Sequence, residues 1–257
     1  MKEIEKKITH PAWPEASVDP ILGYLQRKYI PDLLNIDIAG LMNDESVGRV
    51  ALVSSFGTES AALLHFAANI IPDVPVLFLD TKKHFRETLD YRDQLRELFS
   101  LNLIVVTPRE DDLRREDPDG GLNKQDPNSC CLLRKTFPLQ DALSSYDSWI
   151  SGRKRFQATS RSTIPIIERD GSKIKINPFA LWTKERLDCY FKEHDLPRHP
   201  LEAKGYVSVG CSPCTSPVSE GADPRSGRWS GFPEKTECGI HLGPDGTLTR
   251  SGSRSAR

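Results

Sequence analysis

The fold is decided by residues 49–60, which read Arg-Val-Ala-Leu-Val-Ser-Ser-Phe-Gly-Thr-Glu-Ser. The apolar run that opens this stretch is typical of a short strand buried inside a parallel sheet. Gly57 begins a polar turn, and a helix begins at Ala61 in the sequence Ala-Ala-Leu-Leu-His-Phe-Ala-Ala. The stretch therefore predicts a strand, a turn and a helix in close succession.

The same unit of strand and helix recurs along the chain. Residues 74–80 and 101–107 predict a second and a third strand, and a helix over 85–98 follows the second. Further strands are expected at 148–153 and 173–179, and further helices at roughly 21–42, 130–143 and 183–193. Strands that alternate with helices predict an α/β fold, with an open parallel sheet flanked by helices on both faces.

Composition divides the chain into four segments. Residues 1–20 are polar and are expected to form an N-terminal arm, and residues 21–204 carry the signals of the α/β domain. Residues 205–243 are rich in Gly, Ser, Pro and Cys and predict an irregular C-terminal arm. Residues 244–257 predict a disordered tail.

Bulk charge and hydropathy narrow the classes of partner. The 257 residues carry a formal net charge of -1, which gives no support to a nucleic-acid or membrane partner held by bulk electrostatics. No stretch approaches the roughly 18 apolar residues that span a bilayer, and the N-terminus lacks the apolar core of a secretory signal. A cytoplasmic location is therefore expected, where thiols stay reduced unless they do chemistry or bind metal.

The turn at residues 54–60 has the character of an anion-binding loop. Such a turn between a strand and a helix directs backbone N–H groups and the positive end of the helix at an anion, and Ser55 and Ser60 add hydroxyl donors beside Gly57. It matches neither the Walker A loop nor the G-x-G-x-x-G pattern. A plain polar turn with a helix cap is the alternative. The spacing Ser-x-Gly-x-Glu-Ser resembles the PP-loop of adenine-nucleotide-binding proteins, and so favours a nucleotide-binding domain.

Four of the six cysteines fall in two close pairs, Cys130-Cys131 and Cys211-Ser-Pro-Cys214. Four thiolates suit either a zinc ion or an iron–sulfur cluster. Adjacent cysteines fit the usual spacing of zinc ligands poorly, so a cluster is favoured over zinc, buried thiols or a vicinal disulfide. Lys135, four residues after Cys131, and Arg134 are candidates to bring positive charge to this site. An exposed basic helix face is the alternative for both, and it is favoured for Arg134.

Cys238 stands apart from both pairs, with Lys235 and His241 nearby. A lone thiol near positive charge is the setting that lowers the pKa of a cysteine and makes it a nucleophile. A metal role for Cys238-x-x-His241 is the alternative. Cys189, within an expected helix, is interpreted as a small buried apolar residue without a functional role.

Arginines suit the oxygens of phosphate and sulfate because their planar forks donate two parallel hydrogen bonds. Arg153 and Arg161 follow the predicted fourth strand, at the edge where open α/β sheets bind ligands. Arg225 and Arg228 lie in the C-terminal arm. A solvated surface position is the alternative for each, but as a set they indicate a small polyanionic substrate.

Taken in order, these motifs resemble the APS/PAPS reductase family, and specifically its cluster-containing assimilatory adenylyl-sulfate (APS) reductases. The resemblance runs from about Arg49 to Leu242. It rests on Ser55-Phe-Gly-Thr-Glu-Ser60, Leu79-Asp-Thr81, Glu87-Thr88, Cys130-Cys-Leu-Leu-Arg-Lys135, Gly152-Arg-Lys-Arg155, Gly210-Cys-Ser-Pro-Cys-Thr215, Arg225-Ser-Gly-Arg-Trp229 and Lys235-Thr-Glu-Cys-Gly-Ile-His-Leu242.

The resemblance implies a complete set of roles. The two cysteine pairs would ligate a [4Fe-4S] cluster, and Cys238 would attack the sulfur of APS to leave an S-sulfocysteine and AMP. A thioredoxin or glutaredoxin-like reductant would then release sulfite, as in assimilatory sulfate reduction. Substrate-binding roles are implied for Ser55, Gly57, Ser60, Asp80, Thr81, Lys135, Arg153, Arg161, Arg225, Arg228 and His241.

One residue departs from the family pattern. Lys82 stands where the family typically has glycine, so the loop after the second strand is expected to run differently there.

Three other functions compete with this one. A PAPS reductase would perform the same chemistry on the 3′-phosphorylated substrate, although members specialised for PAPS generally lack both cysteine pairs. An ATP-pyrophosphatase type ligase or tRNA-modifying enzyme would explain the loop but leave Cys238 without a role. A non-enzymatic iron–sulfur sensor would show nucleotide or redox binding without turnover. The sequence leaves the oligomeric state open, a homo-oligomer included.

Overall fold

The computed structural model describes residues 19–219, 221–232, 234, 235 and 237. Most of the expected N-terminal arm and the whole expected tail at 244–257 lie outside these residues. So do Cys238 and His241, to which the sequence assigns roles in catalysis and substrate binding.

The described chain folds around one six-stranded sheet with the strand order β3-β2-β1-β4-β6-β5. All neighbouring strands run parallel except β5 and β6, which are antiparallel. The strands are β1 (Val50–Ser54), β2 (Val76–Leu79), β3 (Leu103–Val106), β4 (Ser148–Ser151), β5 (Ile167–Asp170) and β6 (Lys173–Ile176). The open, mostly parallel sheet is the one predicted from the sequence.

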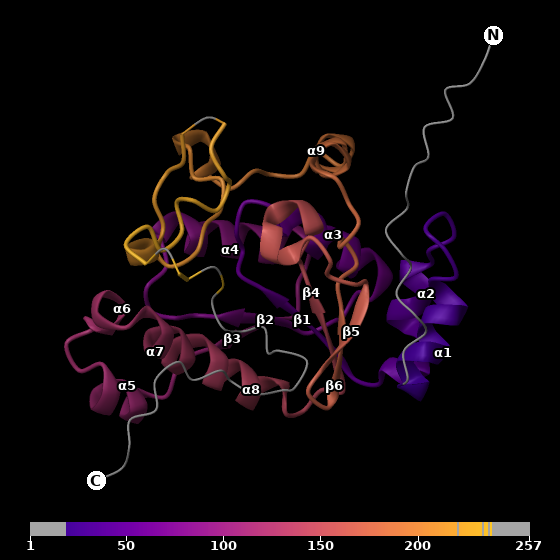
Figure 1. Cartoon of the computed structure of the whole chain (residues 1–257), viewed down its shortest axis with the longest axis horizontal. Helices are drawn as coiled ribbons and strands as arrows, with labels where there is room; N and C mark the ends of the chain where they lie inside the picture. Colours follow the sequence, from indigo (N-terminus) through magenta and orange to yellow (C-terminus); the bar gives the residue numbers. More distant parts are fainter. Residues whose placement is uncertain (1–18, 220, 233, 236, 238–257) are drawn as a thin grey trace.

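Helices cover both faces of this sheet, with α3 and α4 on one side and α5 to α8 on the other (Figure 1). They are α1 (Pro20–Tyr29), α2 (Ile38–Asn43), α3 (Ser60–Ile70), α4 (Arg86–Leu98), α5 (Glu110–Glu116), α6 (Leu122–Gln125), α7 (Pro127–Cys131), α8 (Phe137–Leu143) and α9 (Lys184–Glu193). None of the helices in the described chain combines the length and the hydrophobicity required to span a bilayer.

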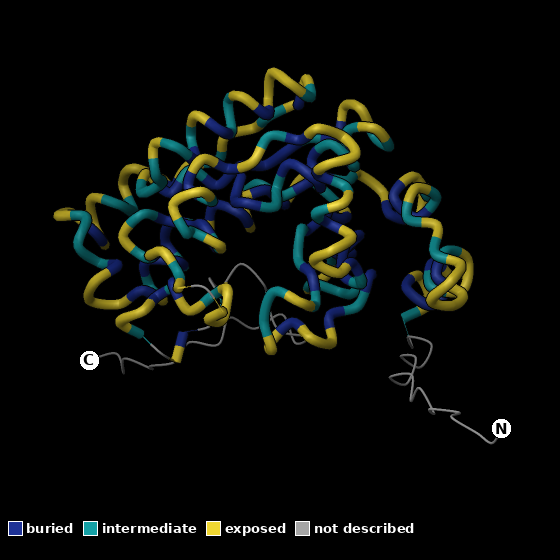
Figure 2. Tube along the Cα trace, turned by 90° about the horizontal axis from the view of Figure 1, so that it is seen from above, coloured by how far each residue is buried: buried dark blue, intermediate teal, exposed yellow. Residues whose placement is uncertain are grey.

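Two apolar cores correspond to the two faces. The larger core packs α3, α4, α9 and the N-terminal helices against one face, with Phe56, Phe78 and Ile150 fully buried at its centre. The smaller packs Leu139 and Leu143 of α8 against Trp149 and its neighbours on the other face. The helices bury their inner sides and expose their outer sides, as the tube in Figure 2 shows.

The prediction of one N-terminal helix over residues 21–42 is wrong. The segment forms two helices, α1 and α2, separated after Ile30 because Pro31 has no backbone N–H and disfavours the α conformation in the residue before it. The helix expected over 183–193 is confirmed. Thr183 caps it by accepting a hydrogen bond from the Arg186 N–H at 3.2 Å.

Strand β5 is absent from the sequence-based expectation. It reads Ile-Glu-Arg-Asp, which has little of the apolar character expected of a strand in a parallel sheet. The signal that identifies it is the pair Asp170-Gly171, because Gly171 has a φ of 63° and turns the chain directly into β6.

A buried charged ladder lies on the β4–β6–β5 side of the sheet. Lys175 is paired in register with Trp149 and Glu168, and its ammonium lies 4.4 Å from the centre of the Trp149 ring. Glu168 and Asp170 lie 3.8 and 4.0 Å from that ammonium. Burial, together with the nearby charge of Arg153, lowers the pKa of Lys175 from 10.5 to about 8.

This shift predicts a rise in stability under alkaline conditions. The folded state loses the Lys175 proton near pH 8, and the unfolded chain holds it until about pH 10.5. The destabilisation from burying the charge is therefore complete below pH 8 and is relieved between those values, by about 3 kcal/mol. We expect the free energy of unfolding of the wild-type chain to rise, relative to Lys175→Met, across this window in denaturant titrations. A difference that does not change with pH would contradict the assignment.

Candidate active site

A cleft of about 510 Å³ lies at the carboxyl ends of β1 and β4. These strands are neighbours although β2 and β3 intervene in the sequence, which makes this the switch point at which open α/β sheets bind ligands. The volume suits a nucleotide-sized molecule. Eight of the residues assigned to substrate binding from the sequence line the cleft: Ser55, Gly57, Ser60, Lys135, Arg153, Arg161, Arg225 and Arg228.

The loop between β1 and α3 forms one wall. Its left-handed residue is Phe56, with a φ of 50° and a fully buried ring, and not the glycine that follows. A Cβ at Gly57 would lie 3.4 Å from the carbonyl oxygen of Val209, an ordinary contact distance, so the loop packs directly against the C-terminal arm. The N-cap residue of α3, Glu59, makes no side-chain cap, so its carboxylate does not cover the N–H groups that begin this helix.

Glu59 instead connects this loop to the segment after β4. Its Oε2 accepts hydrogen bonds from Lys154 Nζ at 3.0 Å and from Gln157 Nε2 at 2.6 Å. Lys154 is almost fully buried, and burial lowers its pKa while Glu59 opposes that shift. Gln157 Oε1 in turn accepts a hydrogen bond from Arg161 Nη1 at 2.5 Å. A continuous polar network therefore sets the position of Arg161.

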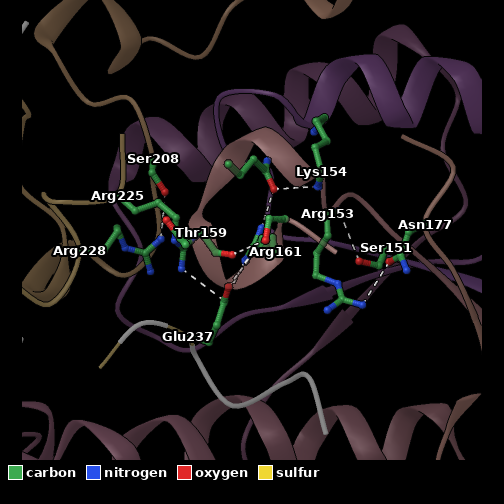
Figure 3. Close-up of polar contacts among 12 residues, drawn as sticks. Ser151, Arg153, Lys154, Thr159, Arg161, Asn177, Ser208, Arg225, Arg228 and Glu237 are labelled. Carbon is green, nitrogen blue, oxygen red and sulfur yellow. Dashed lines mark hydrogen bonds and ion pairs between the residues drawn. The ribbon is translucent and has the colours of Figure 1, made fainter. Parts of the chain in front are cut away.

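The Arg161 guanidinium forms a fork around the Glu237 carboxylate. Its Nε and Nη2 donate to Oε1 and Oε2 at 2.6 and 2.8 Å, and Arg225 Nη2 donates to Oε2 at 3.3 Å (Figure 3). Burial alone raises the pKa of Glu237, but the hydrogen bond and charge of Arg161, with the charge of Arg225, hold it below its usual range. The cleft thus presents two converging arginines to one anionic group.

The other two arginines are held by different partners. Arg153 is paired with Glu168 and lies 3.4 Å from Asn177 Oδ1. Arg228 lies over the Trp229 ring, with 4.5 Å from its guanidinium carbon to the ring centre, and its Nη1 is 3.5 Å from Ser208 Oγ. A Cβ at Gly210 would lie 2.2 Å from Arg228 Nη2, so the glycine leaves room for the guanidinium in this position.

The two cysteine pairs lie next to one another, on α7 and on the 211–214 segment. Cys211 pairs with His84 in an isolated β-bridge, and its Sγ is 3.2 Å from the buried Thr81 hydroxyl. Cys130, Cys131 and Cys211 are buried and Cys214 is half-buried, with no disulfide among them. Within the described chain no group of three or more His, Cys, Asp or Glu side chains converges closely enough to hold a single metal ion.

The pKa of Cys211 is shifted in the opposite direction to that of Cys130. Burial, then the adjacent Cys131, raise the pKa of Cys130 to about 12, and Cys211 contributes to that rise. Burial also raises the pKa of Cys211, but the charge of Lys135 and the Thr81 hydrogen bond bring it below its usual value. Lys135 therefore acts on the cysteine site and lines the cleft at once. Four thiols on two adjoining segments are the type of ligand that an iron–sulfur cluster would take.

The helix expected over 130–143 contains a wide turn. Residues Leu132–Thr136 form a π-helical turn between α7 and α8, a feature frequent at functional sites. The expected exposed position of Arg134 is wrong, since this residue is buried. It donates to Asp117 Oδ2 from Nε at 3.1 Å and Nη2 at 2.5 Å, and to the Thr81 carbonyl at 2.9 Å. Arg134 thus ties this turn to the end of α5 through Asp117 and to the loop after β2 through Thr81.

That loop also explains the departure at Lys82. Lys82 has a φ of 60°, the left-handed conformation that glycine adopts most easily, so the loop keeps a glycine-like backbone with a lysine in place. Asp80 Oδ1 accepts a hydrogen bond from the Lys82 N–H at 2.9 Å. Neither Asp80 nor Thr81 is among the residues that line the cleft.

Several residues of the site escaped the sequence analysis. Glu59, Lys154, Gln157 and Glu237 line the cleft, and all but Gln157 belong to motifs already quoted. The signal for Glu237 is its position directly before Cys238. The expectation of a buried Cys189 is wrong, because this cysteine is exposed on α9.

Residues 49–217 match the phosphoadenosine phosphosulfate reductase domain. The chain belongs to this family. The family resemblance of the motifs is thereby confirmed.

Relatives extend the match over most of the chain. An adenosine 5'-phosphosulfate reductase from Chelativorans sp. is 50% identical over 196 residues, 76% of this chain and 80% of that protein. Another from Mesorhizobium japonicum is 46% identical over 228 residues, 88% of this chain and 87% of that protein. A crystal structure of the phosphoadenylyl-sulfate (PAPS) reductase from Candida auris, as a phosphate complex, has a TM-score of 0.63 at 23% identity. It covers 79% of this chain and 98% of that chain, and it supports the fold alone.

The buried Arg134–Asp117 pair predicts a large loss of stability on truncation. Asp117→Ala leaves a buried guanidinium without its carboxylate, and we expect the free energy of unfolding to fall by about 3–5 kcal/mol in chemical denaturation. The matched control is Asp111→Ala, which removes one partner of an exposed pair and should cost far less. Equal losses in the two variants would contradict the structural role of the buried pair.

Proposed function

We propose that this chain reduces adenylyl sulfate (APS) to sulfite and AMP. The observation that carries the proposal is the cleft at the ends of β1 and β4, where Arg161 and Arg225 converge on one anionic group beside the cysteine pairs. Relatives that are 50% and 46% identical to the chain are named adenosine 5'-phosphosulfate reductases, which supports APS as the substrate.

In this proposal the cleft binds the nucleotide through its anionic part. The N-terminus of α3, with Ser55 and Ser60, faces the phosphate, and Arg161 and Arg225 hold the sulfate oxygens. These donors stabilise the negative charge that grows on the AMP phosphate as it leaves. Because Gln157 already fixes Arg161, little reorganisation is required when the substrate arrives.

Cys238 is the proposed nucleophile, and His241 a neighbouring substrate-binding group. The Cys238 thiolate forms a bond to the sulfur of APS, the bond from that sulfur to the phosphate oxygen breaks, and its electron pair leaves with AMP. A thiolate of a dithiol reductant, of the thioredoxin or glutaredoxin type, then attacks the Cys238 sulfur and expels sulfite. The second thiol of the reductant resolves the mixed disulfide, so two electrons pass from the dithiol to the sulfonyl group.

The four paired cysteines are proposed to hold a [4Fe-4S] cluster. Cys130, Cys131, Cys211 and Cys214 supply the right ligand type on two adjoining segments, and Lys135 lies beside them. When bound, the cluster would supply charge and rigidity near the cleft. A redox role is not needed, because two-electron thiol chemistry requires no one-electron carrier. Lys135, which acts on Cys211 and lines the cleft, connects that site to the substrate anion.

The first test is sulfite release from APS by anaerobically purified protein with thioredoxin. Replacing Cys238 by Ser should lower the rate by at least about 1,000-fold, because the nucleophile is lost. Cys189→Ser is the matched control, since this exposed thiol on α9 lies outside the cleft, and its rate should stay unchanged. Activity on PAPS alone would overturn the substrate assignment. Full activity of Cys238→Ser would overturn the nucleophile.

The cluster is tested separately by chemical analysis. Protein purified anaerobically should contain roughly four iron and four sulfide atoms per chain, and Cys211→Ser should lose most of both. Cys189→Ser should keep them. Stoichiometric zinc in the wild-type protein, with no acid-labile sulfide, would reject the cluster in favour of a structural zinc site.

A further inference from the structure

Glu237 makes contacts that the proposed reaction leaves unexplained. Its carboxylate accepts two parallel hydrogen bonds from Arg161 and a third from Arg225, and Figure 3 shows it between the two side chains. Two parallel donors on one planar acceptor are also the arrangement in which an arginine binds a sulfate or phosphate group. Glu237 therefore occupies the position at which these arginines would bind the substrate anion.

The charges in the cleft set Glu237 in competition with a substrate anion. The other lining carboxylate, Glu59, is already held by Lys154 and Gln157, away from Arg161. Glu237 is thus the carboxylate that meets the arginine fork. A substrate anion placed on the same donors would lie beside this carboxylate, and like charges at contact distance repel strongly in a partly buried site.

Arg161 retains a separate anchor if Glu237 leaves. Its Nη1 donates to Gln157, while its Nε and Nη2 face Glu237. Exchange of one anion for another on Nε and Nη2 therefore leaves the guanidinium in place. The segment that bears Glu237 is anchored at a different point, because Lys235 Nζ donates to Asn128 Oδ1 at 2.5 Å and lies 5.3 Å from the centre of the Trp229 ring.

The position of Glu237 in the chain couples this exchange to the nucleophile. Cys238 is the next residue in the sequence and is joined to Glu237 by one peptide bond. A backbone movement that withdraws the carboxylate from the fork therefore also moves the residue that bears the proposed nucleophile.

We infer that Glu237 is a positioning residue whose carboxylate occupies the Arg161–Arg225 fork until the anionic group of the substrate displaces it. This inference rests on the proposed function, because it takes APS as the displacing anion. Substrate binding and repositioning of the residue before Cys238 are then one event. The observed substrate affinity is lowered by the fraction of molecules in which Glu237 holds the fork.

The test measures binding without turnover. Calorimetric titration of APS into the Cys238→Ser protein gives the reference affinity, and adding Glu237→Gln should tighten it by about tenfold because the competing charge is gone. Glu237→Asp keeps the charge and should stay nearer the reference. Glu234→Gln is the matched control, an exposed acidic residue three positions earlier, and should leave the affinity unchanged.

Kinetics separate positioning from a merely structural role. With Cys238 intact, Glu237→Gln should lower KM for APS without raising kcat, the signature of a removed competitor. A fall in kcat and in melting temperature with KM unchanged would overturn the inference. Equal APS affinity in the Glu237→Gln and reference proteins would overturn it too, while sulfite release by the wild-type chain left the proposed function standing. Failure of every variant to bind APS, with no sulfite from the wild type, would reject both proposals together.

Discussion

The ion pair between Lys154 and Glu59 joins the two loops on which the cleft is built. One partner follows β4 and the other precedes α3, so the contact crosses the sheet where the chain reverses its direction of winding. Because the ammonium is almost fully buried, losing its partner would leave a charge uncompensated, at a cost of about 3–5 kcal/mol. Gln157 extends the contact to Arg161. The position of the arginine fork therefore depends on a pair that itself need touch no ligand.

The sequence predicted the elements whose signals are local. The apolar run before Ser55 and the Thr183 cap each identify an element without reference to distant residues, and both are confirmed. Strand β5 escaped because its polar residues are explained only by the neighbouring ladder that contains Lys175. Arg134 is buried through a carboxylate 17 residues away, and no local pattern reveals that partner. The same reason hid Glu237, because Arg161, which donates two of its hydrogen bonds, lies 76 residues back in the chain.

Buried ion pairs in this structure fall into two kinds. The Arg134–Asp117 pair is bounded by fixed backbone groups, since Arg134 also donates to the Thr81 carbonyl. The pair of Arg161 with Glu237 opens on the cleft, and its acid belongs to the C-terminal arm. The first kind stabilises the arrangement of elements. The second keeps a cation compensated while an anionic ligand is absent, so the cleft holds a preorganised fork without an exposed charge.

The four paired cysteines all lie on α7 and the 211–214 segment, and none lies on a strand of the sheet. The larger apolar core draws no residue from either segment, and the smaller draws none from them either. The cysteine site and the cleft are therefore supported by different parts of the fold. Replacing the thiols removes no residue from either apolar core, and it leaves the loop at residues 54–60 with its own contacts. Loss of the thiols would change the surroundings of Lys135, because its charge acts on Cys211 and its side chain lines the cleft.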